Sequence, residues 1–184
     1  MFLAAVSRPF WDTNYNLRFD RKIGIWPFIT KDPARHLSRN WSDGTIISKE
    51  ITSTNANLYR QFLIEKVLTA TQEKWLGYRS HTPIDIQQDN ACPYVPPNVP
   101  AFIEAVQSNS LDIRLVLHPP NIPNLNLLDI GFFKSIQCLQ HMISPSNIYK
   151  IITLVQEIFQ QVHSNKLNNI FLTLKKVVEL CIIR

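Results

Sequence analysis

Residues 84–91 read IDIQQDNA, a short alternation of apolar and polar side chains that ends on an acid and an amide. Such an alternation is typical of a half-buried β-strand. Pro93, Pro96 and Pro97 follow closely and favour an irregular loop. We therefore predict a strand that delivers Asp89 to the end of a sheet, which is where α/β proteins bind their ligands.

An Asp-Asn pair after a strand also has a purely structural interpretation. Both side chains accept hydrogen bonds from nearby backbone amides, and this makes them common turn residues. The position of Asp89 and Asn90 alone leaves both interpretations open.

A second acid follows a similar strand pattern. Residues 111–118 read LDIRLVLH and lead into a proline-rich loop, PPNIPNLN at 119–126, after which we expect a helix that carries Asp129. Residues 90–128, 39 in number, separate the two acids. We expect the carboxylates of Asp89 and Asp129 to lie within about 10 Å of each other, close enough to share a pair of metal ions.

These segments resemble the transposases of the mariner type, in particular their plant-type branch. The resemblance rests on IQQDNA at 86–91, on the proline-rich loop at 119–126 and on LDIGFF at 128–133. Three more segments are similar: MFLAAV at 1–6, KIGIWPF at 22–28 and FLIEKVL at 62–68. Together they span nearly the whole chain, so the match is specific.

The resemblance implies an RNase H-like α/β fold, a mixed sheet flanked by helices, in which three acids bind two divalent metal ions for DNA cutting and joining. It implies that Asp89 is the second acid and Asp129 the third, with Mg²⁺ or Mn²⁺ as the cofactor. The interval between them is the one expected of the plant-type branch, whose triad ends in Asp rather than Glu.

The first acid of the family lies upstream of the MFLAAV strand, in an Asp-Glu-Lys-Trp-like context, and would here precede Met1. So would the helix-turn-helix module that reads the ends of the element. We therefore expect a remnant with its first strand missing, weakened metal binding and no transposition activity. Glu73, in EKW at 73–75, echoes the lost motif only 16 positions before Asp89, and we interpret it as a surface helix terminus whose Trp75 packs inward.

The charge and composition of the chain suit a domain that contacts a polyanion. The chain has 184 residues, 45% of them hydrophobic, and a net charge of +5, which suits one buried core and a basic surface. Arg35, Arg39, Asn90 and Lys134 are predicted to contact DNA weakly and without sequence preference. A solvated surface insertion anchored by Trp41 explains the two arginines equally well.

Cysteine usage and hydropathy indicate the cellular compartment in which the protein is expected. The three cysteines are far apart and odd in number, which argues against a disulfide framework and a structural zinc site. No apolar run reaches the roughly eighteen residues of a membrane span, and Arg8 and Pro9 interrupt the apolar start too early for a signal peptide. We expect a soluble intracellular protein without a membrane partner, and the resemblance implies the nucleus.

The apolar periodicity predicts the remaining elements. Residues 2–6 are uniformly apolar, which predicts a strand covered on both faces and paired with a strand at 22–29. The predicted connections are 8–21 and 30–44, and a short strand is predicted at 45–51. Helices are predicted after the cap residues 52–55, as far as Trp75, and from Asn98 over 99–107, with Phe102, Ile103 and Val106 facing inward.

Two amphipathic helices, begun by residues 144–146 and near Asn165, are predicted to close the chain. We thus expect residues 1–143 to form the catalytic domain and residues 144–184 a C-terminal helical hairpin packed on it.

Two other interpretations stay open. One is a non-catalytic nucleic-acid-binding or interaction protein on an RNase H-like scaffold. The other is a fragment that scarcely folds, because the lost strand leaves a sheet position unpaired. A homodimer, or association with a full-length transposase, is the further partnership that we consider.

Overall fold

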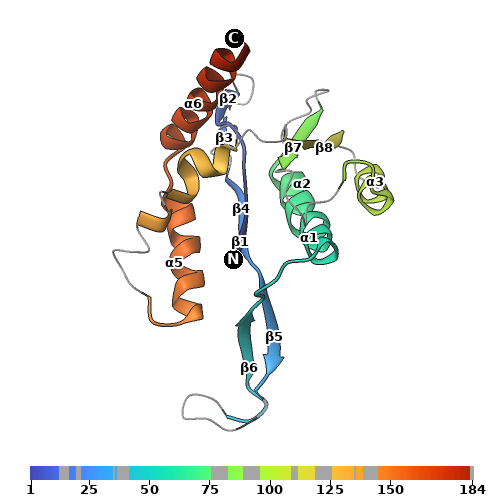
Figure 1. The fold of residues 1–184 in the computed structure, drawn as a ribbon, viewed down its shortest axis with the longest axis vertical. Helices are drawn as coiled ribbons and strands as arrows, with labels where there is room; N and C mark the ends of the chain where they lie inside the picture. Colours follow the sequence, from blue (N-terminus) through green and yellow to red (C-terminus); the bar gives the residue numbers. More distant parts are fainter. Residues whose placement is uncertain are drawn as a thin grey trace.

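The computed structural model describes residues 1–12, 17–19, 22–34, 36, 42–75, 83–88, 96–108, 112–118, 126–134, 136–138 and 145–182. Within them the protein is a mixed α/β structure with small sheets, as predicted (Figure 1). The described strands pair two by two, and the finer prediction of an RNase H-like sheet stays a prediction.

Strands β1 (Phe2–Val6) and β4 (Lys22–Pro27) form an antiparallel pair, with Phe2 opposite Pro27 and Ala5 opposite Gly24. This confirms the predicted pairing. Successive side chains of a strand point to opposite faces of the sheet, and Ala4 packs into one core while Leu3 and Ala5 pack against another. The strand is therefore covered on both faces, as its apolar run predicts.

The two cores lie on opposite faces of this sheet. The C-terminal core consists of Ala4, Ile25, Phe132, Ile136, Leu154, Val155, Ile158, Phe159, Val162, Leu167 and Ile170. The α1–α2 core consists of Phe28, Tyr59, Leu63, Val67, Leu68, Phe102, Ile113 and Leu115.

Two short ribbons lie partly in segments that were predicted to be connections, which hold β2, β3 and most of β5. Strand β2 (Phe10–Asp12) pairs with β3 (Leu17–Phe19), and β5 (Ile29–Pro33) pairs with β6 (Ile46–Glu50). The strand predicted at 45–51 is confirmed as β6. Figure 1 shows the β5–β6 ribbon reaching away from the rest of the molecule. Ladder hydrogen bonds, rather than burial, hold such a ribbon, so the polar sequence of β5 gave no strand signal beyond residue 29.

One helical run covers a face of the β1–β4 sheet. It comprises α1 (Ala56–Phe62), the π-helical segment η1 (Leu63–Leu68) and α2 (Thr69–Trp75). Asn55 caps it, since its side chain accepts a hydrogen bond of 2.8 Å from the Leu58 amide. Glu73 is exposed and Trp75, the last residue, is half-buried. The predicted helix, its cap region and the interpretation of Glu73 as a surface terminus are all confirmed.

Strands β7 (Ile84–Gln88) and β8 (Ile113–Leu117) are parallel, with Ile84 opposite Ile113 and Gln88 opposite Leu117. Parallel neighbours need a crossover, which contains α3 (Pro100–Gln107).

Two details of the predicted α3 are wrong. Val99, not Asn98, is the N-cap residue, because Pro100 has no amide hydrogen and suits the first helical position. Phe102 is buried, but Ile103 is 39% exposed, so it does not face inward.

The C-terminal part begins with the π-helical segment η3 (Leu128–Phe132), followed by α5 (Ile148–Gln161) and α6 (Ser164–Ile182). Both amphipathic helices are confirmed, although the N-cap of α5 is Asn147, whose side chain accepts from the Lys150 amide at 2.9 Å. Figure 1 shows α5 and α6 following one another along the same side of β1 and β4. None of the described helices combines the length and apolarity needed to cross a membrane.

Polar contacts tie α5 to the strands. The buried Lys22 ammonium donates to the Gln160 carbonyl in the last turn of α5, where helix carbonyls lack partners within the helix. The Ser48 amide of β6 donates to the Tyr149 hydroxyl at 2.8 Å. These contacts hold both ends of the helix against the sheet and the ribbon.

Candidate functional site

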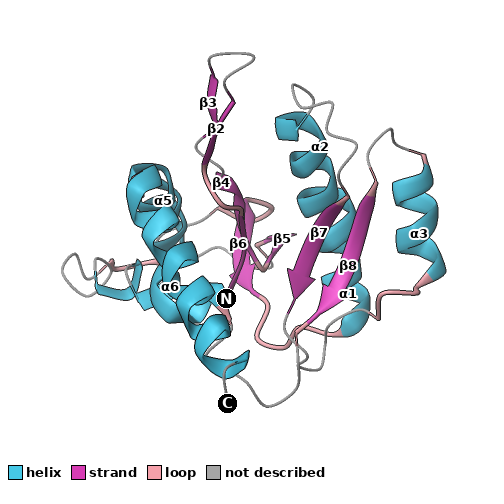
Figure 2. Cartoon of the chain, turned by 90° about the horizontal axis from the view of Figure 1, so that it is seen from above, coloured by secondary structure: helices cyan, strands magenta, loops and turns pink. Residues whose placement is uncertain are grey.

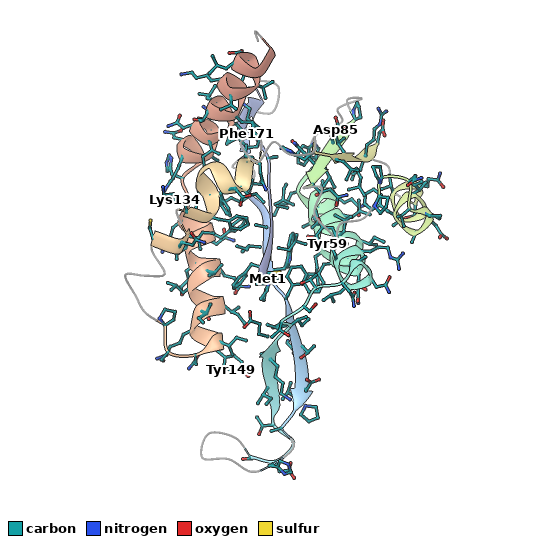
Figure 3. All side chains as sticks on the ribbon, in the orientation of Figure 1. Met1, Tyr59, Asp85, Lys134, Tyr149 and Phe171 are labelled. Atoms are coloured by element: carbon teal, nitrogen blue, oxygen red, sulfur yellow. The ribbon has the colours of Figure 1, made fainter. Side chains whose placement is uncertain are left out.

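A cleft of about 450 Å³ lies between β1 on one side and β7 on the other. Both ribbon views show the β7–β8 pair set apart from β4, the partner of β1 (Figures 1 and 2). Figure 3 labels Asp85 of β7 and Phe171 of α6, which line the cleft from opposite sides. The cleft is therefore bounded by parts of the chain that are distant in sequence, among them β1, the α1–α2 run, β7, η3 and α6.

Asp129 lines this cleft and lies in the first turn of η3, exposed to solvent. This confirms the prediction that a helix after the proline-rich loop carries this acid. The Asn126 side-chain amide donates to Asp129 Oδ2 at 2.7 Å, and Asn126 Oδ1 accepts from the Leu128 amide at 3.2 Å. Asn126 therefore orients the carboxylate. Asn126 had no predicted role, and the signal that would have found it is its position three residues before the acid.

Gln88 and His118 form the ends of the parallel pair at the same cleft. Both side chains are buried, and both residues line the cleft. The His118 amide donates to the Gln88 carbonyl at 2.9 Å, so the pairing continues one residue past β8. Gln88 is the residue directly before Asp89 in the sequence. The described residues thus bring the end of β7 and Asp129 to one cleft.

Four of the predicted site residues, Asp89, Asn90, Arg35 and Arg39, lie outside the described residues. The distance between the Asp89 and Asp129 carboxylates stays a prediction for this reason. Lys134 is described, exposed and two residues beyond η3, and it does not line the cleft. Its contact with DNA also stays a prediction.

The donor chemistry at Asp129 fits a hard divalent ion. Mg²⁺ and Mn²⁺ prefer carboxylate and carbonyl oxygens, and Mg²⁺ is usually held by one or two carboxylates together with water and phosphate. An exposed carboxylate oriented by Asn126 meets that requirement. Within the described part of the chain, no cluster of three or more His, Cys, Asp or Glu residues is placed to hold a metal ion.

Asp85 is a further acid on the cleft, and its surroundings differ from those of Asp129. It lies opposite Arg114 in the β7–β8 register. The Arg114 guanidinium donates to Asp112 at 2.7 Å. This hydrogen bond and the charge of Asp112 raise the pKa of Arg114, and the charge of Asp85 raises it further. Asp85 thus faces a cation on its own sheet, which argues against a role in binding metal.

No protein-family model matches the chain, and no curated protein matches it either.

Proposed function

We propose that the chain is part of the RNase H-like catalytic domain of a mariner-like transposase, in which Asp89 and Asp129 hold divalent metal ions. The observation that supports this most is that Gln88 and Asp129 line the same cleft, because Asp89 directly follows Gln88. The parallel β7–β8 pair also fits, since the carboxyl ends of parallel strands are where such sheets bind ligands.

Each residue of the site would have its own role. Asp89 and Asp129 would supply the carboxylate oxygens, and Asn126 holds the second carboxylate in a fixed orientation through its 2.7 Å hydrogen bond. A divalent ion pair, when bound, supplies activation of the nucleophilic oxygen and stabilisation of the leaving oxygen. Lys134, which is exposed, would add a positive charge for phosphate.

The 184-residue chain should bind DNA without cutting it. The resemblance assigns only two of the three acids to residues of this sequence, and two carboxylates gather a pair of cations poorly. The net charge of +5 supports weak phosphate contacts that do not depend on the base sequence.

Duplex binding measured by fluorescence anisotropy over a salt series tests this. We expect roughly three to five phosphate contacts, each contributing about −0.9 to the slope of log affinity against log salt. Asp89→Asn should preserve or slightly strengthen binding, since it removes a negative charge that faces phosphate.

A nicking assay on supercoiled plasmid with Mg²⁺ or Mn²⁺ should show no cleavage. Reproducible nicking that Asp89→Asn abolishes would contradict the proposal that the chain does not cut DNA. Binding that is absent or independent of salt would remove DNA as a partner, and binding that metal ions leave unchanged would favour the non-catalytic binding protein.

A further inference from the structure

The side of α6 that lines the cleft also packs on the segment that carries Asp129. Phe171, labelled in Figure 3, and Leu174 line the cleft from α6. A Cβ atom at Gly131 of η3 would lie 3.3 Å from Cγ1 of Ile170, so the backbone of η3 lies directly against α6. Asp129 is two residues before Gly131. This side of α6 is therefore next to the candidate metal site.

Two basic residues flank Phe171 along this side of the helix. Arg8, which follows β1 and also lines the cleft, donates from Nε to Asn168 Oδ1 at 3.4 Å. Lys175 is exposed and lies four residues beyond Phe171, on the same face of the helix. The seven residues from Asn168 to Lys175 span about 10 Å of the helix axis. We call Arg8 and Lys175 the basic rim of the cleft.

The next lysine of α6 lies on a different face. Lys176 shares a row with Asn169, Thr173 and Leu180, all of which are exposed. Consecutive residues of an α-helix are about 100° apart around its axis, so Lys175 borders the half-buried side that lines the cleft, while Lys176 lies on the outer face. The helix thus places two adjacent lysines of equal charge in different surroundings.

The contacts that the basic rim makes leave it able to bind an anion. The Lys175 ammonium lies 3.7 Å from Glu179 Oε1, with side chains that are 67% and 55% exposed. An ion pair so exposed is weak and yields readily to another anion. A guanidinium has five N–H donors in a fixed fork that suits phosphate, and the bond from Arg8 to Asn168 uses one of them.

We propose that the basic rim binds the phosphate backbone of duplex DNA at the edge of the cleft, so that one strand follows this side of α6 toward Asp129. The proposal rests on the proposed DNA and metal binding, and it assigns two of the roughly three to five phosphate contacts expected of the chain. One strand of a duplex carries a phosphate about every 3.4 Å along its axis. Groups about 10 Å apart along α6 would therefore meet phosphates about three steps apart.

The two adjacent lysines give a matched pair of variants for anisotropy measurements over a salt series. Lys175→Gln should weaken duplex binding and reduce the slope of log affinity against log salt by about 0.9, the loss of one phosphate contact. Lys176→Gln removes the same charge from the neighbouring residue and should leave the slope unchanged. Equal losses of slope in both variants, or no loss in Lys175→Gln, would overturn the proposal.

The second contact is tested at Arg8. Arg8→Gln should also reduce the slope by about 0.9, and combining it with Lys175→Gln should reduce the slope by about 1.8. A thermal melt establishes that Arg8→Gln folds, because the bond to Asn168 also joins the end of β1 to α6. A folded Arg8→Gln variant with an unchanged slope would contradict the assigned contact. If Arg8→Gln does not fold, the two lysine variants decide the question, since both lysines are exposed.

The unaltered chain separates a failure of this proposal from a failure of the proposed function. Salt-dependent duplex binding that Lys175→Gln does not alter would reject the basic rim and keep DNA as a partner. If the unaltered chain shows no salt-dependent binding, both proposals are rejected.

Discussion

Gly24 shows how one residue of β4 is constrained by its neighbour two positions on. A Cβ atom at residue 24 would lie 2.2 Å from Cζ2 of the Trp26 ring, far inside van der Waals contact. Trp26 packs against the α1–α2 core, so its indole covers the glycine and is itself held by the core. The close approach, rather than a special backbone angle, requires glycine here.

Gly24→Ala should therefore lower the free energy of unfolding by roughly 1–3 kcal/mol, the usual range for overpacking. Urea denaturation measures it. Gly131→Ala is the control, because its Cβ would lie 3.3 Å from Cγ1 of Ile170, a side chain that is able to shift. A Gly24→Ala variant as stable as the unaltered chain would show that Trp26 moves aside freely.

At the scale of elements, the cap at Asn55 starts the helix that covers one face of the β1–β4 sheet. Its side chain satisfies the Leu58 amide, which has no partner within the helix. Asn55→Ala should lower the free energy of unfolding by about 1 kcal/mol.

Asn57→Ala, in the first turn of the same helix, should change stability by less than about 0.5 kcal/mol, since its Oδ1 accepts a solvent-exposed hydrogen bond from the Arg60 guanidinium. Chemical denaturation of both variants checks the comparison. Equal losses would contradict the capping role.

The elements that could be predicted from sequence have a strong apolar period. The alternation in β7, the apolar run of β1 and the stripes of α1, α5 and α6 each match a buried face in the structure. Strands β2, β3 and most of β5 could not be predicted this way, because pairing with a neighbouring segment holds them and their composition is partly polar. The start of α3 was misplaced for another reason: Asn98 has the side chain of a good cap, but Pro100 sets the first turn.

At the scale of the whole molecule, two cores share one thin sheet. Leu167 at the start of α6 is fully buried in the C-terminal core, where Phe132 and Phe159 also meet edge to face with ring centroids 5.8 Å apart. This core joins α5 and α6 to β1 and β4, so the stability of the whole molecule should depend on it.

Leu167→Ala should lower the free energy of unfolding by about 2–5 kcal/mol through lost burial and the cavity left behind. Leu180→Ala, at a position on the same helix that is 67% exposed, should change it by less than about 0.5 kcal/mol. Calorimetric or denaturant melts measure both. A small effect at Leu167 would mean that α6 is not an integral part of the fold.

The candidate site could be predicted from sequence in part. Asp129 at the start of a helix follows from the proline-rich loop before it, and the end of β7 follows from the alternation that leads to Asp89. The role of Asn126 has a local signal, its position three residues before the acid. The cleft between β1 and β7 depends on contacts between distant segments, which no local pattern encodes.

Binding of Mn²⁺ followed by electron paramagnetic resonance tests the proposed metal pair most directly. Asp89→Asn and Asp129→Asn should each weaken binding about tenfold or more. Asp85→Asn, which alters an acid that lines the same cleft but faces Arg114, should leave it unchanged. Loss of Mn²⁺ binding in Asp85→Asn, or its full retention in Asp89→Asn, would contradict the assignment of Asp89 and Asp129 as the metal ligands.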